Sequence, residues 1–166
     1  RTGGICTFPP LKLDFDRPTT AGTIFEGENK LKLVTQCRPT ASYEQMLVRE
    51  FVVYRIYNEV TPLSFRVRPV RVTYHDTDGR LQDNTRFAFL VEDAGDVAKR
   101  NGLKEIKVAG RALASRQIDA AGLVQFSLFQ LLIQNLDAEY FAGPEGETCC
   151  HNSKLVGPEG ATTNLI

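Results

Sequence analysis

The sequence predicts an α+β fold in which an antiparallel β-sheet packs against one helix and is followed by helices of a partial second region. Segments with alternating apolar residues lie on both sides of a single amphipathic helix, which is typical of such a unit. A polar crossing at Glu92 and Asp93 then changes the character of the chain. We therefore expect a β-rich region at residues 1–92 and a partial helical region at residues 93–166.

Two short strands are expected before the helix. Residues 9–16 place apolar side chains at every second position, and residues 31–34 form a second, mostly apolar segment. Arg17 and Pro18 follow the first segment and predict a turn, because proline fixes the backbone angle that a turn requires.

The helix is expected over residues 43–59. Ser42 and Gln45 have the spacing of a capping box at its start, and Thr61-Pro62 ends it. Its apolar residues recur at helical spacing and form two adjacent stripes, made of Leu47, Phe51 and Tyr54 and of Val48, Val52 and Ile56.

A second pair of strands follows the helix. Residues 65–75 alternate, but the phase slips at Pro69, which predicts a bulge or an edge position in the sheet. Residues 76–79 have the composition of a hairpin turn, and residues 87–91 return as a mostly buried strand.

The second region begins with a short helix around residues 96–100. Asp119 is suited to cap a later helix that runs toward Asn135 and is apolar on nearly all sides, so we expect that helix to be deeply buried. Residues 103–116 favour neither helix nor strand, and residues 151–156 have the pattern of a strand.

The composition limits the classes of partner. Lys and Arg number 20 and Asp and Glu number 20, so the formal net charge is zero, which removes the main electrostatic argument for a nucleic-acid partner. The longest apolar run, residues 128–133, is interrupted by Gln130 and is far shorter than the roughly 18–20 residues that span a bilayer.

The four cysteines are Cys6, Cys37, Cys149 and Cys150. None has the CxxC spacing of a zinc site, and two histidines are too few to complete one. Cys6 precedes one expected strand and Cys37 follows another, so a disulfide could join them, while buried free thiols are an equal alternative.

Asp137 and Asn152 are the strongest candidates for a chemical role. Asp137 follows the apolar helix, which anchors its backbone, and Asn152 comes after a loop. An aspartate near an attacking hydroxyl and an asparagine on a divalent metal are two of the parts that phosphoryl transfer requires. The alternative is that both are ordinary turn residues.

Phosphoryl transfer also requires a cation on the nucleotide phosphates and an acid that orients it. Lys12 on the first strand and Lys32 on the second are candidates for the cation, and Glu50 on the helix could pair with either. A solvated strand face is the alternative for each lysine, and the sequence leaves the choice between them open.

Four elements occur in one order along the chain, namely residues 8–15, 49–55 and 87–93, and residues 133–137 with 151–155. In this order the chain resembles CotH-type proteins, the spore-coat-protein-H-like atypical protein kinases, over most of its length. The resemblance implies a kinase-like small lobe, a hinge and a catalytic loop. It also implies ATP with Mg or Mn as cofactors, and transfer of the γ-phosphate to a protein hydroxyl.

The resemblance assigns nucleotide-binding roles in the first region. Lys12 resembles the lysine on the nucleotide phosphates, and Glu50 resembles its partner. Val91 and Glu92 resemble the hinge beside the adenine. A protein substrate is the implied partner, and the resemblance says nothing of the oligomeric state.

The resemblance assigns catalytic roles in the second region. Asp137 resembles the catalytic-loop aspartate, and Asn152 resembles the metal-binding asparagine that follows it. Lys12, Glu50, Asp137 and Asn152 are then expected to converge on one cleft.

The family places an Asp-rich metal segment after the position of Ile166 and an arginine-glycine segment before that of Arg1. We therefore expect an internal fragment of an exported bacterial protein, periplasmic or extracellular, that transfers little phosphate by itself. The alternative function is that of a non-catalytic structural or interaction domain in such a protein.

Overall fold

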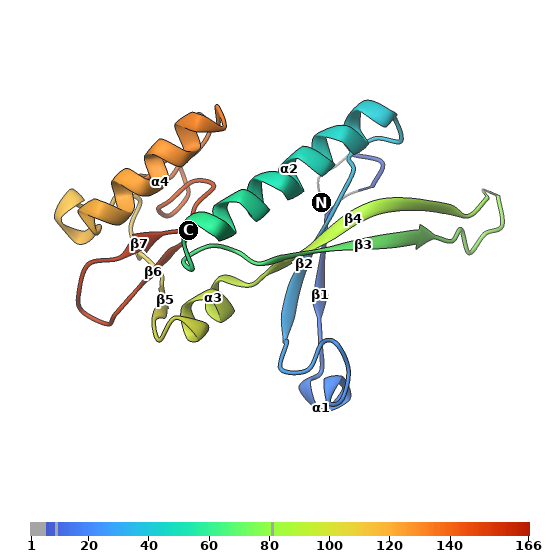
Figure 1. The fold of residues 1–166 in the computed structure, drawn as a ribbon, viewed down its shortest axis with the longest axis horizontal. Helices are drawn as coiled ribbons and strands as arrows, with labels where there is room; N and C mark the ends of the chain where they lie inside the picture. Colours follow the sequence, from blue (N-terminus) through green and yellow to red (C-terminus); the bar gives the residue numbers. More distant parts are fainter. Residues whose placement is uncertain (1–5, 9, 81) are drawn as a thin grey trace. The chain divides into compact units, whose positions relative to one another are not determined.

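The computed structural model describes residues 6–8, 10–80 and 82–166. Helices combine with antiparallel sheets, so the fold is α+β, as the sequence predicts (Figure 1). Within the described residues, no helix is long and apolar enough to cross a membrane.

The chain forms two compact units. The first contains residues 1–56 and 66–93, and the second contains residues 57–65 and 94–166. Helix α2, Ala41–Val60, contributes to both units, because the first unit includes its residues up to Ile56.

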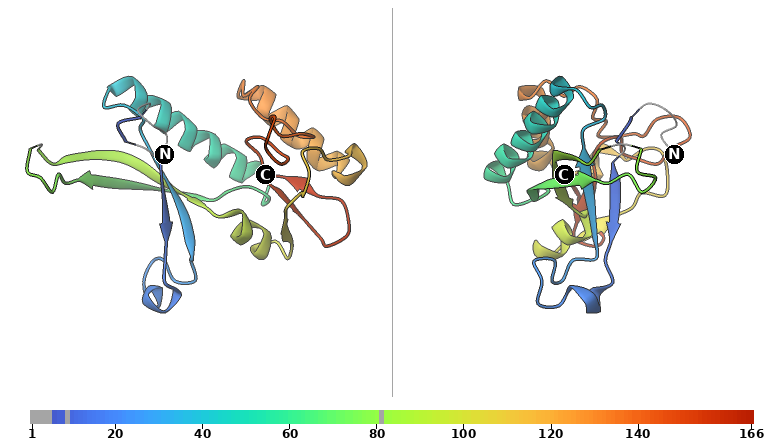
Figure 2. Two further views of the ribbon diagram at one scale, coloured as in Figure 1. Left: turned by 180° about the vertical axis from the view of Figure 1, so that it is seen from behind. Right: turned by 90° about the vertical axis from the view of Figure 1, so that its right-hand side faces the viewer.

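A four-stranded antiparallel sheet in the order β1-β2-β4-β3 forms the first unit. Its strands are β1 Leu11–Asp14, β2 Lys30–Thr35, β3 Val67–Tyr74 and β4 Asn84–Glu92. Of the residues of β4, only 88–92 pair with β2, so the far end of the β3–β4 hairpin is a two-stranded ribbon (Figure 2).

β3 carries Pro69 and lies at an edge of the sheet. Its register with β4 is continuous, with Pro69 opposite Phe89, so the edge alternative is confirmed and these pairs contain no bulge. An edge strand tolerates proline because no further strand needs its missing N–H. The turn after β3 is closed by Asp76, whose carboxylate accepts hydrogen bonds from the N–H groups of Asp78 and Arg80.

A short helix, α1 at Arg17–Thr20, replaces the turn that Arg17 and Pro18 predict. Pro18 lies at the start of this helix, where a proline needs no partner for an N–H group. The Thr19 N–H donates to the Asp16 carbonyl at 2.9 Å. The turn prediction is wrong because the fixed backbone angle of proline suits the first turn of a helix as well as a turn.

Helix α2 begins at Ala41, so Ser42 lies inside its first turn instead of at the N-cap. The capping-box prediction is therefore wrong. The Ser42 hydroxyl lies 3.0 Å from the Thr40 hydroxyl, and the Tyr43 N–H donates to the Thr40 carbonyl at 3.1 Å.

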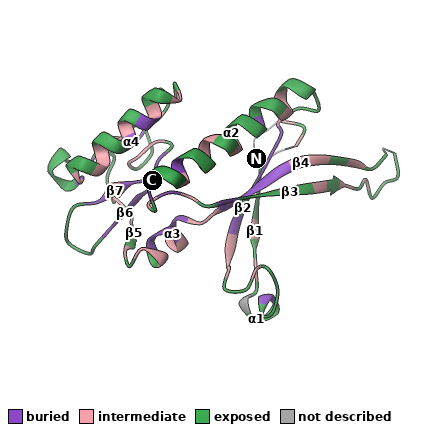
Figure 3. Ribbon diagram, viewed as in Figure 1, coloured by how far each residue is buried: buried purple, intermediate pink, exposed green. Residues whose placement is uncertain are grey.

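The two apolar stripes of α2 differ in burial. In the first stripe, Leu47 is buried, and the ring of Phe51 packs against Phe87 and Phe89 of β4 at centroid distances of 5.9 and 5.7 Å. The second stripe is exposed and consists of Val48, Val52 and Ile56 (Figure 3). The helix therefore covers one face of the sheet with only one of its apolar stripes.

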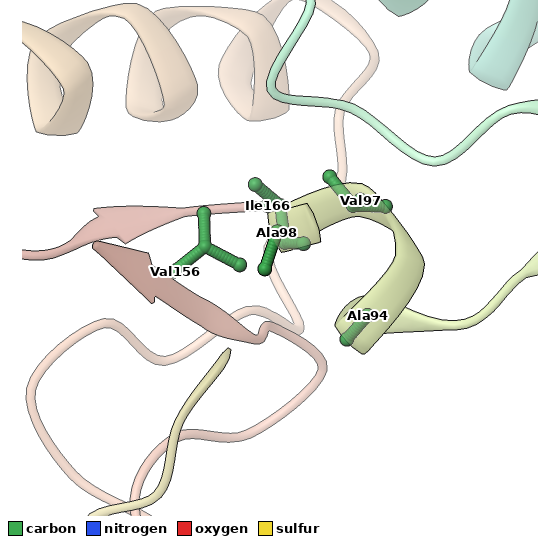
Figure 4. Packing of buried hydrophobic residues seen from close by; sticks show 5 residues of the cluster. All are labelled: Ala94, Val97, Ala98, Val156 and Ile166. Atoms are coloured by element: carbon green, nitrogen blue, oxygen red, sulfur yellow. The ribbon is translucent and has the colours of Figure 1, made fainter. Parts of the chain in front are cut away.

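The second unit combines short helices with a three-stranded antiparallel sheet in the order β5-β6-β7. Its elements are α3 Ala94–Arg100, β5 Lys104–Ile106, the 3-10 helix η1 Ser115–Gln117, α4 Ala120–Leu132, β6 Leu155–Gly157 and β7 Asn164–Leu165. Val97 and Ala98 of α3 pack with Val156 and Ile166 to form its core (Figure 4). The strand expected over residues 151–156 is thus shorter, because its first residues form a turn.

Asp119 caps α4, as predicted, because its carboxylate accepts a hydrogen bond of 2.7 Å from the Gly122 N–H. The prediction of deep burial is wrong. Phe126 and Phe129 are buried, with the Phe129 ring 4.4 Å from that of Tyr57. Leu123 is half-buried, and four further large apolar residues are exposed, namely Val124, Leu128, Leu131 and Leu132 (Figure 3).

Disulfides join Cys6 to Cys37 and Cys149 to Cys150. The first links the segment before β1 to the segment after β2, as the order of the strands allowed. The Thr7 N–H adds a backbone hydrogen bond of 2.8 Å to the Cys37 carbonyl. The second disulfide joins adjacent residues, which no observation on the sequence predicted.

Phe89 is the residue most central to the first unit, since it is 0% exposed and contacts Phe51 and Tyr54 of α2. Phe89→Ala should lower the free energy of unfolding by about 3–5 kcal/mol, because it leaves a cavity among aromatic rings. Ile24→Ala, at a residue that is 73% exposed, should change it by less than about 0.5 kcal/mol. Urea unfolding measures both values, and equal effects would contradict this core.

Candidate functional site

Asp137 is anchored to the end of helix α4 through Asn135. The Asn135 amide nitrogen donates to the Gln130 side-chain oxygen at 2.7 Å. The Asn135 side-chain oxygen accepts a hydrogen bond from the Asp137 N–H at 3.3 Å. The helix therefore fixes the backbone of Asp137, while the Asp137 side chain is 79% exposed and free to meet a ligand.

Asn152 lies directly against Asp137, although 15 positions separate them. The Asn152 amide nitrogen donates to the Asp137 backbone carbonyl at 3.0 Å and to the carboxylate oxygen Oδ2 at 2.8 Å. The other carboxylate oxygen, Oδ1, lies 3.9 Å from Nε2 of His151. The structure thus brings the two predicted residues together and adds a histidine beside them.

Further contacts join the segments on which Asp137 and Asn152 lie. The Glu139 N–H donates to the His151 carbonyl at 3.1 Å, and the Ser153 hydroxyl donates to the Glu139 carbonyl at 3.3 Å. The Cys150 sulfur lies 3.2 Å from the Tyr140 carbonyl oxygen. Residues 137–140 and 150–153 therefore run side by side, and the position of Asn152 does not depend on one hydrogen bond alone.

The backbone around this pair is in an uncommon conformation. Within the described part of the chain, Gln134 and Asn152 are the non-glycine residues with positive φ, at 59° and 51°. Such left-handed angles cost free energy and persist only where surrounding contacts hold them, which is common at functional sites. Gln134 lies three positions before Asp137, and Asn152, a residue type that adopts left-handed angles more readily than most, is itself part of the contact.

The donor atoms suit a hydroxyl and a hard divalent cation. Asn152 uses its amide nitrogen on Asp137, which leaves its side-chain carbonyl oxygen as the kind of ligand that Mg²⁺ or Mn²⁺ prefers. In the described chain, no group of three or more His, Cys, Asp or Glu residues gathers to hold a metal. A cation here would take its further ligands from water or from a bound phosphate, as is usual for Mg²⁺.

Lys32 and Lys12 lie opposite each other on β2 and β1, so both point to one face of the sheet. Lys32 is also opposite Val91, and Phe89 on the same face of β4 packs against α2. Both lysines therefore lie on the face that the Glu50 helix covers.

The charge of Lys32 acts on the Glu50 carboxyl. Burial raises the pKa of this carboxyl, and the positive charge of Lys32 opposes the shift. This effect on the pKa favours Lys32 over Lys12 as the partner of Glu50. Which lysine contacts a phosphate stays a prediction.

Tyr54 belongs to the same group of side chains, one helical turn after Glu50. Burial, and then the negative charge of Glu50, raise the pKa of the Tyr54 hydroxyl to about 12. From the sequence, Tyr54 was expected only as part of the apolar stripe. Its spacing of four residues from Glu50 was the signal that both lie on one side of the helix.

Val91 and Glu92 are the last residues of β4. Val91 is buried, and a carboxylate oxygen of Glu92 accepts a hydrogen bond of 2.9 Å from the Arg66 N–H. Asp93 alone separates β4 from helix α3. A hinge role for Val91 and Glu92 stays a prediction.

The predicted site residues fall in both compact units. Lys12 and Glu50 lie in the first unit, and Asp137 and Asn152 lie in the second. The convergence of all four on one cleft stays a prediction.

No protein-family model, curated protein or solved structure matches this chain. The resemblance to CotH-type kinases therefore stays a prediction from the sequence. The arrangement of the side chains is the remaining ground for a functional argument.

Lys32→Met should raise the pKa of Glu50 further, because it removes the positive charge that opposes the effect of burial. Lys12→Met is the matched control, since Lys12 is the register partner of Lys32 on the next strand and should leave the pKa of Glu50 nearly unchanged. Carbon-13 NMR titration of the Glu50 carboxyl measures both. A larger shift in the Lys12 variant would show that Lys12 is the partner.

Proposed function

We propose that this chain carries the phosphate-handling parts of an atypical protein kinase of CotH type, which transfers the γ-phosphate of ATP to a protein hydroxyl. The observation that carries the proposal is the contact of Asp137 with Asn152 at the end of α4. Phosphoryl transfer depends mainly on positioning and charge, so an exposed carboxylate and a fixed amide oxygen are the parts it needs.

Asp137 is assigned to the acceptor hydroxyl. Its Oδ2 is held by Asn152, and its backbone by Asn135, so the remaining carboxylate oxygen has a defined direction. That oxygen can accept the hydrogen of a serine or threonine hydroxyl and orient its oxygen toward the phosphate. Nε2 of His151 lies 3.9 Å from the same oxygen, Oδ1.

Asn152 is assigned to the cation through its side-chain oxygen. A bound Mg²⁺ or Mn²⁺ would neutralise negative charge on the nucleotide phosphates. The double donation to Asp137 fixes which end of the Asn152 amide faces outward. The same pair of hydrogen bonds therefore orients both proposed functional groups.

Lys32 is assigned to a nucleotide phosphate, with Glu50 as the acid that orients it. The opposing effect of Lys32 on the Glu50 pKa supports an interaction between the two charges. A lysine oriented by a helix carboxylate is the cation that phosphoryl transfer requires. Lys12 is the less favoured candidate, because Lys32 is the lysine whose charge lowers the pKa of Glu50.

A non-catalytic interaction domain is the alternative function. Helix α4 contains no charged residue, and its side chains Val124, Leu128 and Leu131 are 58–63% exposed. An exposed apolar surface of this kind is typical of protein contacts. This surface supports an interaction domain independently of the contact between Asp137 and Asn152.

Asp137→Asn should reduce ATP turnover by about 100-fold or more, because it removes the group that orients the acceptor hydroxyl. The assay uses the full-length protein with Mn²⁺ or Mg²⁺ and follows γ-phosphate transfer to protein. Asp78→Asn is the control, since Asp78 is an exposed acid in the turn after β3 and should leave turnover unchanged. Thermal unfolding shows whether each variant remains folded.

The proposal fails if the full-length protein binds no nucleotide with either cation. It also fails if Asp137→Asn and Asp78→Asn have the same turnover as the unchanged protein. Either result would favour the interaction domain.

A further inference from the structure

Cys149 and Cys150 form a disulfide between adjacent residues, immediately before His151 and Asn152. A bond between neighbouring side chains closes a small ring, which restricts the backbone angles of both residues. We propose that this disulfide is a redox-modifiable site that holds His151 and Asn152 beside Asp137. Its reduction releases that segment.

The disulfide sits where the segment is fixed to its surroundings. The Cys149 N–H donates to the Gly110 carbonyl at 3.1 Å. The Cys150 sulfur lies 3.2 Å from the Tyr140 carbonyl oxygen. A disulfide sulfur has no hydrogen to donate to that oxygen, whereas a thiol does. Reduction therefore does not remove this contact, and what it removes is the ring at residues 149–150. A difference of this kind between the oxidised and reduced forms is required for a switch.

The effect reaches Asn152 through the backbone. Asn152 is two residues after Cys150 and has a left-handed φ of 51°. Asparagine adopts this angle more readily than most residues, and the contacts of the segment select it here. Removing the ring at residues 149–150 removes one of these constraints, so the hydrogen bonds of Asn152 to Asp137 should open more often.

The site is accessible to reagents. Both cysteines are half-exposed, and the preceding residues 145–148 are exposed. A small-molecule or protein dithiol is the proposed reductant. Its two thiols are oxidised to a disulfide as the Cys149–Cys150 bond breaks, and two protons and two electrons pass to the cysteine sulfurs.

The Cys6–Cys37 disulfide provides an internal control. It lies in the first unit and joins residues that are 31 positions apart. A strong reductant acts on both disulfides, so the two must be separated by substitution. The ordering of the loop rests on its own geometry, while any effect on phosphate transfer rests on the proposed function.

Hydrogen exchange measured by mass spectrometry tests the proposal in the full-length protein, with and without a dithiol. Reduction should increase exchange in peptides covering residues 137–140 and 150–153 by about fivefold or more. Cys6→Ser with Cys37→Ser should respond in the same way. Cys149→Ser with Cys150→Ser should exchange fast in both conditions. Alkylation without reduction should leave Cys149 and Cys150 unmodified.

Three results would overturn the proposal. These are alkylation of Cys149 and Cys150 in the protein that has not been reduced, unchanged exchange on reduction, and a full response in the Cys149→Ser, Cys150→Ser variant. Nucleotide affinity, measured on the same samples, separates the two proposals. A redox effect on exchange in a protein that binds no nucleotide would support the redox site and contradict the proposed kinase function.

Discussion

The hydrogen bonds from Asn152 to Asp137 join two segments of the second unit that are 15 positions apart, and the geometry of the candidate site depends on them. Asn135 fixes Asp137 from the other side by connecting it to helix α4. Each hydrogen bond contributes only about 0.5–1.5 kcal/mol. Together they orient one carboxylate and one amide oxygen, and Asn152 has a left-handed φ of 51° in this arrangement. Orientation, more than stability, is the consequence of this arrangement.

A second constraint operates in the first unit, where burial disfavours the charged form of Glu50 on α2. A carboxylate in such a place is stabilised by a nearby cation, and Lys32 of the interior strand β2 has that effect. The charge of Glu50 in turn disfavours ionisation of Tyr54 one turn later.

Much of the fold was predictable, because strands that bury one face carry a period of two in their sequence. Pro69 marked an edge strand, because proline has no N–H to donate to a second neighbouring strand. The start of α2 at Ala41 and the exposure of α4 were not predictable. A helix start shifts by one or two residues at little cost, and an apolar side chain does not reveal whether a partner is present to cover it. Asp137 and Asn152 were predictable as candidates, but their contact was not, because a long intervening loop can close in many ways.

We propose that Asp137 and Asn152 together handle a phosphate-bound divalent cation. Paramagnetic broadening by Mn²⁺ in the presence of ATP tests this proposal, using the nitrogen-15 NMR signals of the full-length protein. We expect the side-chain amide of Asn152 and the backbone amide of Asp137 to broaden at the lowest Mn²⁺ concentrations. The proposal would be wrong if both signals kept their intensity while signals near other acidic residues broadened first.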